Sequence, residues 1–583
     1  MTWLFNNPSE FAKEMISGFV SANASMVRQV SGGVVRNTAS KPDTVAIVIG
    51  GGSGHYPAFA GLVGQGLAHG AAMGNLFASP SAQQICSVAK TVNQGAGVLL
   101  AFGNYAGDVL HFGLARERLI SEGIPCELIA ITDDISSASA DEIHKRRGVA
   151  GDLVVFKTAA AAAEQGATLA EVLAVAQMAN QRTRTIGVAF SGCTLPGADH
   201  PLFNVPQGRM EFGMGIHGEP GIRELAIPTA DELAAMLVDK LLAELPAGIS
   251  RAKGARAGAI LNGLGSVKYE ELFVVWHGVA RRLQEHGITL VDSQVGEFVT
   301  SFDMAGLSLT LFWCNQQLEA LWFAPAYSPA FKVGSVIKAP LLATEDIEAP
   351  AEESVAAATP ESQAVAGQIV IMIERLAEAV IKNADELGRI DAIAGDGDHG
   401  IGMERGARAA RDRAQRAFQQ GAGAGTVLQH AADAWADQAG GTSGAIWGVI
   451  LNTLGTAIGN QEKPTANAIA QAFSQASHGV MHFGKAKPGD KTLVDVLLPF
   501  SEELTLQIEQ GHDLAAAWQL AARKAELCAR ATAQLVPKIG RARPLAARSL
   551  GSPDAGAVSL SLILNAVGET FPAVHPQGDT LCL

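Results

Sequence analysis

Three aspartates lie close together in the segment 391–400, which reads DAIAGDGDHG. Glycines separate Asp391, Asp396 and Asp398 and allow a tight turn, so the three carboxylates can point inward together. Oxygen ligands of this kind suit Mg²⁺, which shares its remaining coordination sites with water and phosphate. The alternative is a polar turn that caps a helix. A calcium-binding EF-hand loop is not favoured, because its bidentate glutamate is absent.

A glycine-rich segment in the same part of the chain is a candidate for phosphate binding. Residues 440–444 (GGTSG) precede a run with helical character. Backbone N–H groups and the hydroxyls of Thr442 and Ser443 can therefore receive a phosphate at a helix N-terminus. The motif is short and common, so by itself it supports this interpretation only weakly.

The segment 484–492 (GKAKPGDKT) resembles the phosphate-binding loop of P-loop NTPases but departs from it. Asp490 interrupts the motif, and no hydrophobic strand leads into it, so we reject a P-loop fold. Asp495 and Arg541 add charge that can contact metal or phosphate. Either residue can equally form a surface ion pair of little energetic consequence.

Two histidines and an acid lie in glycine-rich loops of the N-terminal part. His217 is surrounded by glycines in GMGIHGEPG, which favours close approach of a ligand to its imidazole. His55 ends GGGSGH directly after an apolar run, and Asp108 ends GNYAGD after another. The alternatives are a tight turn that binds nothing and a structural histidine. The loops predict a small-ligand site that uses these side chains.

The elements that must position these residues differ between the two parts of the chain. Short β-branched runs alternate with helical stretches up to about residue 335, which predicts an α/β fold with buried strands. The ends of such strands are where ligands bind. The expected strands are 44–49, 97–102, 127–132, 185–190 and 257–261.

The amino-acid composition changes near residue 336. Residues 342–362 are rich in Ala, Glu, Pro and Ser, and residues 336–362 are predicted to be a linker between domains 1–335 and 363–583. The second domain is predicted to be all-α, with helices that include 369–387, 426–439 and 514–535.

Bulk properties exclude several classes of protein. The chain has 583 residues and a net charge of −14, which offers no basic surface for nucleic acid. No apolar run is long enough to span a membrane, and residues 1–10 lack a secretory signal, so we expect a cytoplasmic protein. The six cysteines form no C-x-x-C pair and are expected to be reduced and mostly buried.

Taken together, the motifs resemble a known family. GGGSGH, NYAGD, GIHGEPG, NGLG at 262–265 and GEFVTSFDMAGLSLTL at 296–311 resemble the ketose-binding domain of the dihydroxyacetone kinase family. GDGDHG, GGTSG, KPGDKT and GRA at 540–542 resemble its nucleotide-binding domain. The matches occur in family order over nearly the whole chain. The resemblance implies an N-terminal domain of two α/β subdomains and a C-terminal domain that is an all-α helical barrel.

The resemblance also implies roles for individual residues. His217 would form a hemiaminal with the ketose carbonyl, while His55 and Asp108 would perform acid–base chemistry. The ketose would contact Gly51, Gly52, Ser53, Gly54, His55, Gly103, Asp108 and His217. Asp391, Asp396 and Asp398 would hold two Mg²⁺ ions. The ATP-binding site would be lined by His399, Gly400, Ile401, Gly402, Thr442, Ser443, Gly484, Leu493, Arg541 and Asp554.

Two positions depart from the family pattern. Gly103 stands where a lysine is usual, so the substrate pocket lacks a cation and has more room, which can admit a longer ketose. Ala555 replaces the proline of a usual Asp-Pro-Gly, a smaller change in loop rigidity. Whether the ketose has three or four carbons, its stereochemistry and the phosphorylated carbon stay open.

The leading hypothesis is a kinase that uses ATP to phosphorylate a terminal hydroxyl of dihydroxyacetone or erythrulose. A non-catalytic ketose-binding regulator is the alternative, but it predicts missing catalytic or metal residues. A side activity that forms cyclic FMN from FAD, known for animal members, is not excluded. The family implies a homodimer through the N-terminal domain, and transfer within one chain or across that dimer are both open.

Overall fold

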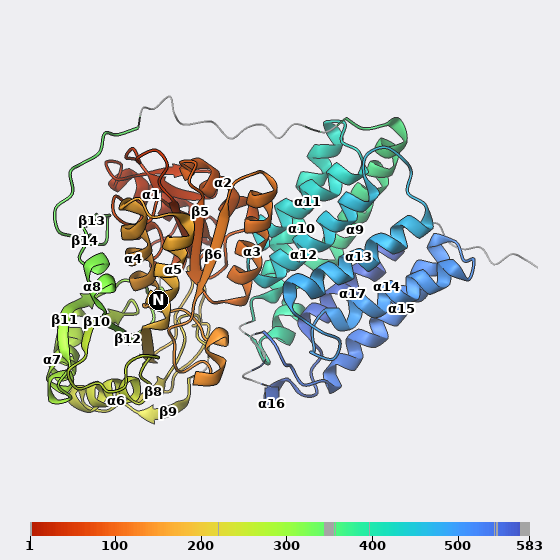
Figure 1. Cartoon of the computed structure of the whole chain (residues 1–583). Helices are drawn as coiled ribbons and strands as arrows, with labels where there is room; N and C mark the ends of the chain where they lie inside the picture. Colours follow the sequence, from red (N-terminus) through yellow and green to blue (C-terminus); the bar gives the residue numbers. More distant parts are fainter. Residues whose placement is uncertain are drawn as a thin grey trace, which may run out of the picture. The chain divides into compact units, whose positions relative to one another are not determined.

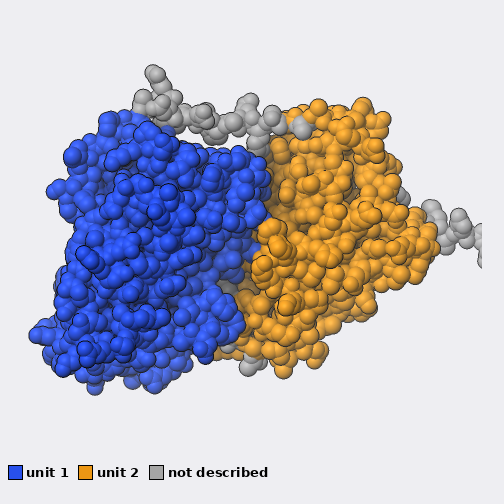
Figure 2. Space-filling view, in the orientation of Figure 1, with its two compact units in different colours: residues 1–351 blue, residues 352–583 orange. Residues whose placement is uncertain are grey.

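The computed structural model describes residues 3–219, 221–342, 355, 357–395, 397–540, 543 and 546–571. The chain forms two compact units, residues 1–351 and 352–583, which Figure 2 shows in blue and orange. The predicted metal ligand Asp396 and the predicted nucleotide contact Arg541 lie outside the described residues. Among the described residues, no helix combines the length and apolar composition needed to cross a bilayer.

The first sheet of the N-terminal unit has six strands in the order β1-β2-β4-β3-β5-β6 (Figure 1). Strands β4, β3, β5 and β6 are parallel, and β1 and β2 add an antiparallel edge. The bounds are β1 Val27–Val30, β2 Gly33–Arg36, β3 Ala46–Gly52, β4 Gly70–Gly74, β5 Val98–Gly103 and β6 Cys126–Ile131.

The second sheet also has six strands, in the order β11-β10-β12-β7-β8-β9. Only β10 and β11 pair in parallel, and every other neighbouring pair is antiparallel. The bounds are β7 Thr183–Ala189, β8 Arg209–Phe212, β9 Arg223–Ala226, β10 Arg256–Gly263, β11 Thr289–Gly296 and β12 Gly306–Trp313. The short pair β13 Ala326–Tyr327 and β14 Lys332–Val333 follows.

Helices cover both faces of each sheet, and the side chains of β3 show why. Ile47 and Ile49 pack with helix α4, whereas Ala46 and Val48 point to the opposite face and pack with α2 and α3. Helix α4 is buried along almost its whole length, as expected of a helix that is apolar all round. Helices α6 and α7 cover the outer face of the second sheet. The bounds are α1 Phe11–Ala22, α2 Ala82–Val92, α3 Ala106–Ser121, α4 Asp152–Glu164, α5 Leu169–Gln181, α6 Ala230–Leu242, α7 Tyr269–Glu285 and α8 Gln316–Trp322.

The C-terminal unit is all-α, as predicted. Each long helix packs against the next, and α17 packs back against α9, which closes the ring. Threonine or aspartate side chains cap several of these helices by accepting an N–H from the first turn, including Thr359, Thr465, Asp513 and Asp554. The bounds are α9 Pro360–Asp391, α10 His399–Gln419, α11 Ala424–Ala439, α12 Gly441–Ile458, α13 Ala466–Gly484, α14 Val494–Glu509, α15 Leu514–Ala531, α16 Ala546–Ser549 and α17 Ala555–Gly568.

The five predicted strands correspond to β3, β5, β6, β7 and β10, and the predicted helices correspond to α9, α11 and α15. Several boundaries differ from the prediction, including the following two. The glycines of GGGSGH are not a loop after the strand, because β3 continues through Gly52. Helix α15 stops at Ala531, and a 3₁₀ turn follows it. The five described cysteines are free, and three of them are buried.

Candidate functional site

The motif GGGSGH forms the end of β3 and the 3₁₀ turn Ser53–His55. Its glycines are required by packing. A Cβ at Gly51 would lie 2.3 Å from the ring of Phe59, and one at Gly52 would lie 2.4 Å from the carbonyl oxygen of Leu76. The close approach of neighbouring chain segments holds this turn in place and presents the buried His55 at the carboxyl end of the strand.

His217 lies on the loop between β8 and β9, in the second sheet. Two of the loop glycines, Gly213 and Gly218, have φ of +88° and +82°, which side-chain-bearing residues rarely adopt. A Cβ at Gly215 would lie 2.2 Å from a carboxylate oxygen of Glu219. The glycines therefore let the loop fold tightly around His217 and Glu219.

The two histidines, 162 residues apart in the sequence, are in direct contact. Their Nε2 atoms are 2.9 Å apart, and their rings meet edge to face. The Nδ1 atom of His55 lies 2.7 Å from the carbonyl oxygen of Thr300. The Nδ1 atom of His217 lies 3.2 Å from a carboxylate oxygen of Glu219. Burial, together with the nearby charge of His217, lowers the pKa of His55 to about 3.

Aromatic rings surround the histidine pair. The ring of Tyr105 lies 4.4 Å from that of His217 and nearly perpendicular to it, and Phe77 packs against both histidines. The hydroxyl of Tyr105 donates to the carbonyl of Gly148 at 2.8 Å, which fixes the ring. The site is thus largely apolar with a few fixed polar atoms, as is usual for small-molecule sites.

Asp108 lies in the first turn of α3, three residues after the N-cap residue Tyr105. It is buried, with 7% of its surface exposed. Asp152, the first residue of α4, is close enough to feel the charge of Asp108. Burial raises the pKa of Asp152 well above its ordinary value, and the charges of Asp133 and Asp108 add to the effect.

Gly103 ends β5 beside these acids. A Cβ built there would lie 3.2 Å from the ring of Tyr105 and 3.4 Å from Oδ2 of Asp152. The position therefore faces the same group of side chains, and its missing side chain leaves Asp152 without a neighbouring cation from this position.

Two buried polar atoms of the region are unsatisfied. The hydroxyl of Ser53 and Oδ1 of Asp152 have no hydrogen-bond partner within the part of the chain that the structure describes. Both residues are at most 2% exposed. Because buried polar atoms are nearly always paired, these two atoms are suited to bind the hydroxyl groups of a ligand.

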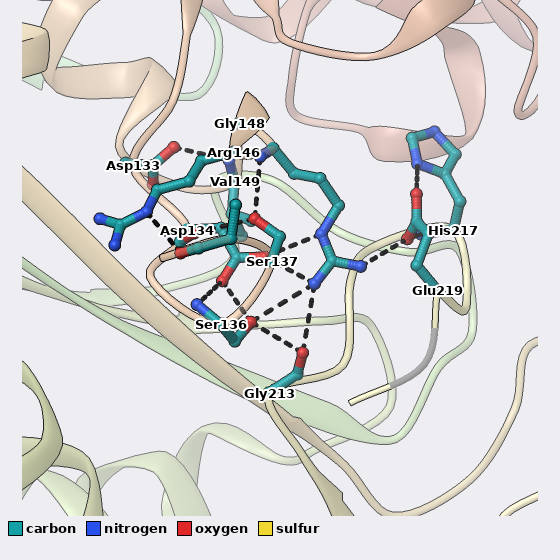
Figure 3. A network of polar contacts seen from close by, with 12 residues as sticks. Asp133, Asp134, Ser136, Ser137, Arg146, Gly148, Val149, Gly213, His217 and Glu219 are labelled. Carbon is teal, nitrogen blue, oxygen red and sulfur yellow. Dashed lines mark hydrogen bonds and ion pairs between the residues drawn. The ribbon is translucent and has the colours of Figure 1, made fainter. Parts of the chain in front are cut away.

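Arg147 joins the His217 loop to the turn after β6. Figure 3 labels its partners Asp134, Gly213 and Glu219. The guanidinium of Arg147 bonds Asp134 at 2.8 Å, donates to the carbonyl of Gly213 at 3.2 Å, and lies 3.8 Å from Glu219. The hydroxyl of Ser136 also donates to the carbonyl of Gly213, at 2.8 Å. This network fixes Glu219, which touches His217.

In the C-terminal unit, His399 joins the beginnings of three helices. It is the first residue of α10, its Nδ1 atom lies 3.3 Å from the hydroxyl of Ser443 in α12, and its Nε2 atom lies 3.0 Å from that of Ser559 in α17. Burial lowers the pKa of His399, which favours the neutral ring. Helix N-termini carry partial positive charge and free N–H groups, so this convergence suits an anionic phosphate.

Carboxylates lie beside these helix ends. Burial raises the pKa of Asp554 to about 7, and the charges of Asp391 and Asp495 contribute. Asp391 accepts the N–H of Gly397 at 2.9 Å, and Asp398 occupies the N-cap position of α10. Among the described residues, no three acidic, histidine or cysteine side chains converge into a metal site. Carboxylates that lie close together repel one another, and a bound divalent cation relieves this repulsion. The carboxylates present therefore fit Mg²⁺.

The other predicted nucleotide contacts occupy helix ends of the same unit. Gly400, Ile401 and Gly402 are in the first turn of α10, and Thr442 is in the first turn of α12. Gly484 ends α13, and Leu493 is the N-cap residue of α14. The side chain of Asp554 caps α17 by accepting the N–H of Ala557 at 2.7 Å.

Several residues near the proposed sites were not predicted from the sequence. Glu219 lies in the GIHGEPG motif, so its spacing of two residues from His217 was a usable signal. Arg147 and Asp152 carry no such signal, because they approach the site from segments distant in sequence. Lys491 lies in the segment 484–492, which is rejected as a P-loop; it is buried and donates to the carbonyl of Ser549 at 2.6 Å.

Comparisons with known proteins agree with this architecture. The Dak1 domain model matches residues 17–330, and the DAK2 domain model matches residues 393–569. The chain is 64% identical over 567 residues to an L-erythrulose kinase of Pectobacterium atrosepticum, covering 97% of this chain and 96% of the relative. It is 51% identical to a D-erythrulose kinase of Mycolicibacterium smegmatis, covering 99% of this chain and 100% of that one.

A solved structure is similar over the same extent. The dihydroxyacetone kinase from C. freundii in complex with AMP-PNP and Mg²⁺ matches with a TM-score of 0.52 and 27% identity. The match covers 98% of this chain and 100% of that chain.

Proposed function

This chain belongs to the dihydroxyacetone kinase family, and from that premise we propose that it phosphorylates the four-carbon ketose erythrulose with ATP, holding the ketose covalently on His217. Two relatives with more than half of their residues identical are named erythrulose kinases, which supports the four-carbon substrate over dihydroxyacetone. The 2.9 Å contact between His217 and His55 carries the proposal for the site.

The contact supports covalent capture for a chemical reason. A neutral imidazole nitrogen can add to the electrophilic carbon of a ketone, and a polyol offers no such carbon. His55 lies next to the reacting nitrogen of His217 and can pass a proton to the ketone oxygen. The resulting hemiaminal selects ketoses over glycerol.

The remaining residues would orient the ketose and receive its proton. Asp108, buried in the first turn of α3, is the proposed base that accepts the proton of the attacking hydroxyl. The unsatisfied atoms of Ser53 and Asp152 would bind the other hydroxyls. Gly51, Gly52, Gly54 and Gly103 would let the ketose approach the backbone.

The nucleotide would bind at the helix N-termini that meet around His399. The hydroxyls of Thr442 and Ser443 and the neighbouring backbone N–H groups would bind phosphate oxygens. Asp391, Asp396 and Asp398 would hold two Mg²⁺ ions. When bound, Mg²⁺ neutralises phosphate charge during phosphoryl transfer, a reaction that depends mainly on positioning and electrostatics.

Steady-state kinetics with purified protein and Mg-ATP test the proposal. The panel contains L- and D-erythrulose, dihydroxyacetone, glyceraldehyde and glycerol, with ADP release as the readout. We expect the highest kcat/KM with an erythrulose enantiomer and little turnover of glycerol. Glycerol turnover as fast as any ketose would contradict covalent capture, and no ADP release with any ketose would leave the non-catalytic regulator.

The variant His217→Ala addresses the capture step. It should lose most of the discrimination between ketoses and glycerol, because the group that recognises a carbonyl is gone. His200→Ala, which changes an exposed histidine of the same unit, is the matched control and should behave as the unchanged protein.

The proposed assembly is a homodimer through the N-terminal unit, on the basis of the family resemblance. Light scattering on the full chain measures it, and a monomer at the enzyme concentrations used for kinetics would contradict it.

A further inference from the structure

The hydrogen-bond partners of the two histidines restrict where their protons lie. The carbonyl oxygen of Thr300 can only accept, so Nδ1 of His55 carries a hydrogen. The carboxylate of Glu219 likewise accepts from Nδ1 of His217. In two neutral rings with these tautomers, both Nε2 atoms carry a lone pair. Their 2.9 Å contact is then a hydrogen bond only if one extra proton lies between them.

The extra proton belongs to the ring of His217. The buried position of His55 disfavours its charged form, whereas His217 lies against a carboxylate. The ring of His217 therefore faces a carboxylate that can balance a positive charge on it.

Glu219 remains ionised although it is buried. Burial by itself raises the pKa of this carboxyl, but the charge of His217, its hydrogen bond and the charge of Arg147 outweigh burial, and the pKa is lowered. Backbone geometry also fixes the carboxylate, because Oε2 accepts the N–H of His217 at 3.0 Å. The Cβ that Gly215 lacks would occupy the space that Glu219 and Arg147 fill.

Arg147 is itself held by a second carboxylate. Its Nε atom donates to Asp134 at 2.9 Å, and the N–H of Ser136 donates to the same carboxyl group at 2.9 Å. Figure 3 shows this chain of contacts running from Asp134 to Glu219 and His217. Tyr105 adds no charge at neutral pH, since burial and the charge of Glu219 raise its pKa well above the ordinary value.

We infer that Glu219, fixed by Arg147, is a positioning residue that sets the tautomer of His217 and balances the positive charge of its ring before and after the ketose is bound. The inference rests on the proposed function, because it concerns the same covalent step. Neither residue touches the substrate in this role.

The step balances in protons and charge. His55 takes the Nε2 proton of His217, whose freed lone pair forms a bond to the ketone carbon. The C=O π bond breaks, and its oxygen takes the proton from His55. The product is a ring bonded to carbon at Nε2 that still carries the Nδ1 proton and one positive charge. His55 is neutral again, and Glu219 faces the same charge throughout.

The test is ¹³C NMR of the full-length protein with erythrulose labelled at the carbonyl carbon. Adduct formation converts the carbonyl signal into that of a tetrahedral carbon. In the unchanged protein Glu219 faces the charged ring of the adduct, so the adduct yield should be the same at pH 7 and at pH 8. In Glu219→Gln the charged ring of the adduct has no counter-charge, so the charged adduct is destabilised and rising pH should disfavour it.

Two results are expected for Glu219→Gln. At pH 8 its affinity for erythrulose should be about 10- to 100-fold weaker, the usual range for loss of a hydrogen bond to a charged group. Its adduct yield should fall with rising pH, which a purely structural role would not produce. Glu224→Gln is the matched control, since Glu224 pairs with Arg209 on the exposed side of the neighbouring strands.

A second variant tests the arginine. Arg147→Met should show the same pH-dependent loss in a weaker form, whereas Arg209→Met should not. Wild-type affinity and a constant adduct yield in Glu219→Gln would overturn the inference while leaving covalent capture intact. Absence of a tetrahedral signal in the unchanged protein would instead overturn covalent capture itself, and the inference with it.

Discussion

Gly103 and Asp152 face each other at the end of β5, beside the residues proposed to bind the ketose. Asp152 is 2% exposed, and its Oδ1 atom has no partner among the described residues. Its raised pKa means that this carboxyl retains its proton more readily than an ordinary aspartic acid and can donate to a hydroxyl. Because position 103 carries no side chain, this hydrogen-bonding group stays accessible beside the proposed ketose site.

The variant Gly103→Lys should lower the preference for erythrulose over dihydroxyacetone. The lysine would press against Tyr105, because its Cβ would lie 3.2 Å from that ring, and would place an ammonium near Asp152, occupying the group that the proposed longer ketose needs. We expect the ratio of kcat/KM for erythrulose to that for dihydroxyacetone to fall about 10-fold or more, the range for one carbon in a closed pocket.

Gly113→Lys is the control for this variant, because a Cβ at Gly113 in α3 meets nothing within 4 Å. It should leave the ratio unchanged. If Gly103→Lys folds and also leaves the ratio unchanged, position 103 does not decide the length of the ketose.

At the scale of elements, the first turn of α10 depends on how closely it packs against α9. A Cβ at Gly400 would lie 1.9 Å from the carbonyl oxygen of Ala384. At Gly402 the nearest atom would be 3.9 Å away, in ordinary van der Waals contact. A side chain at position 400 would therefore clash with α9, whereas a small side chain at position 402 would fit.

Alanine at these two positions should change stability in opposite directions. Gly402→Ala should stabilise the protein by about 0.5–1 kcal/mol, the usual gain of alanine over glycine in a helix. Gly400→Ala should destabilise it by about 1–3 kcal/mol, because α10 must move away from α9. Urea unfolding followed by circular dichroism measures both changes, and equal effects would contradict the packing argument.

At the scale of the whole molecule, each of the two compact units contains one of the proposed sites. Erythrulose should bind the N-terminal unit, and Mg-AMP-PNP should bind the C-terminal one. A ligand slows local opening where it binds, so each should protect a different set of amides.

Hydrogen exchange of the full chain, read by mass spectrometry, checks this division. Erythrulose should protect peptides from the end of β3 and the β8–β9 loop. Mg-AMP-PNP should protect the beginnings of α10, α12 and α17. Protection of the C-terminal helices by erythrulose alone would contradict the assignment of the two sites.

Much of the architecture could be predicted from local sequence patterns. Buried strands such as β3 and β5 are short β-branched runs, and the C-terminal helices follow from their periodicity and from capping residues such as Thr359. Both signals arise from interactions within a few residues along the chain, so no knowledge of the tertiary fold is needed.

The glycine loop around His217 was also visible in the sequence, since glycine marks positions where backbone and ligand approach closely. The contact between His217 and His55 was not, because the two residues come from different sheets whose strand orders no local pattern encodes. For the same reason, neither the position of Arg147 nor the meeting of three helix N-termini at His399 could be predicted from the sequence. Sequence alone determined which side chains stand at the ends of strands and helices. Only the tertiary structure decided which of those ends meet, because that depends on packing between segments far apart in the chain.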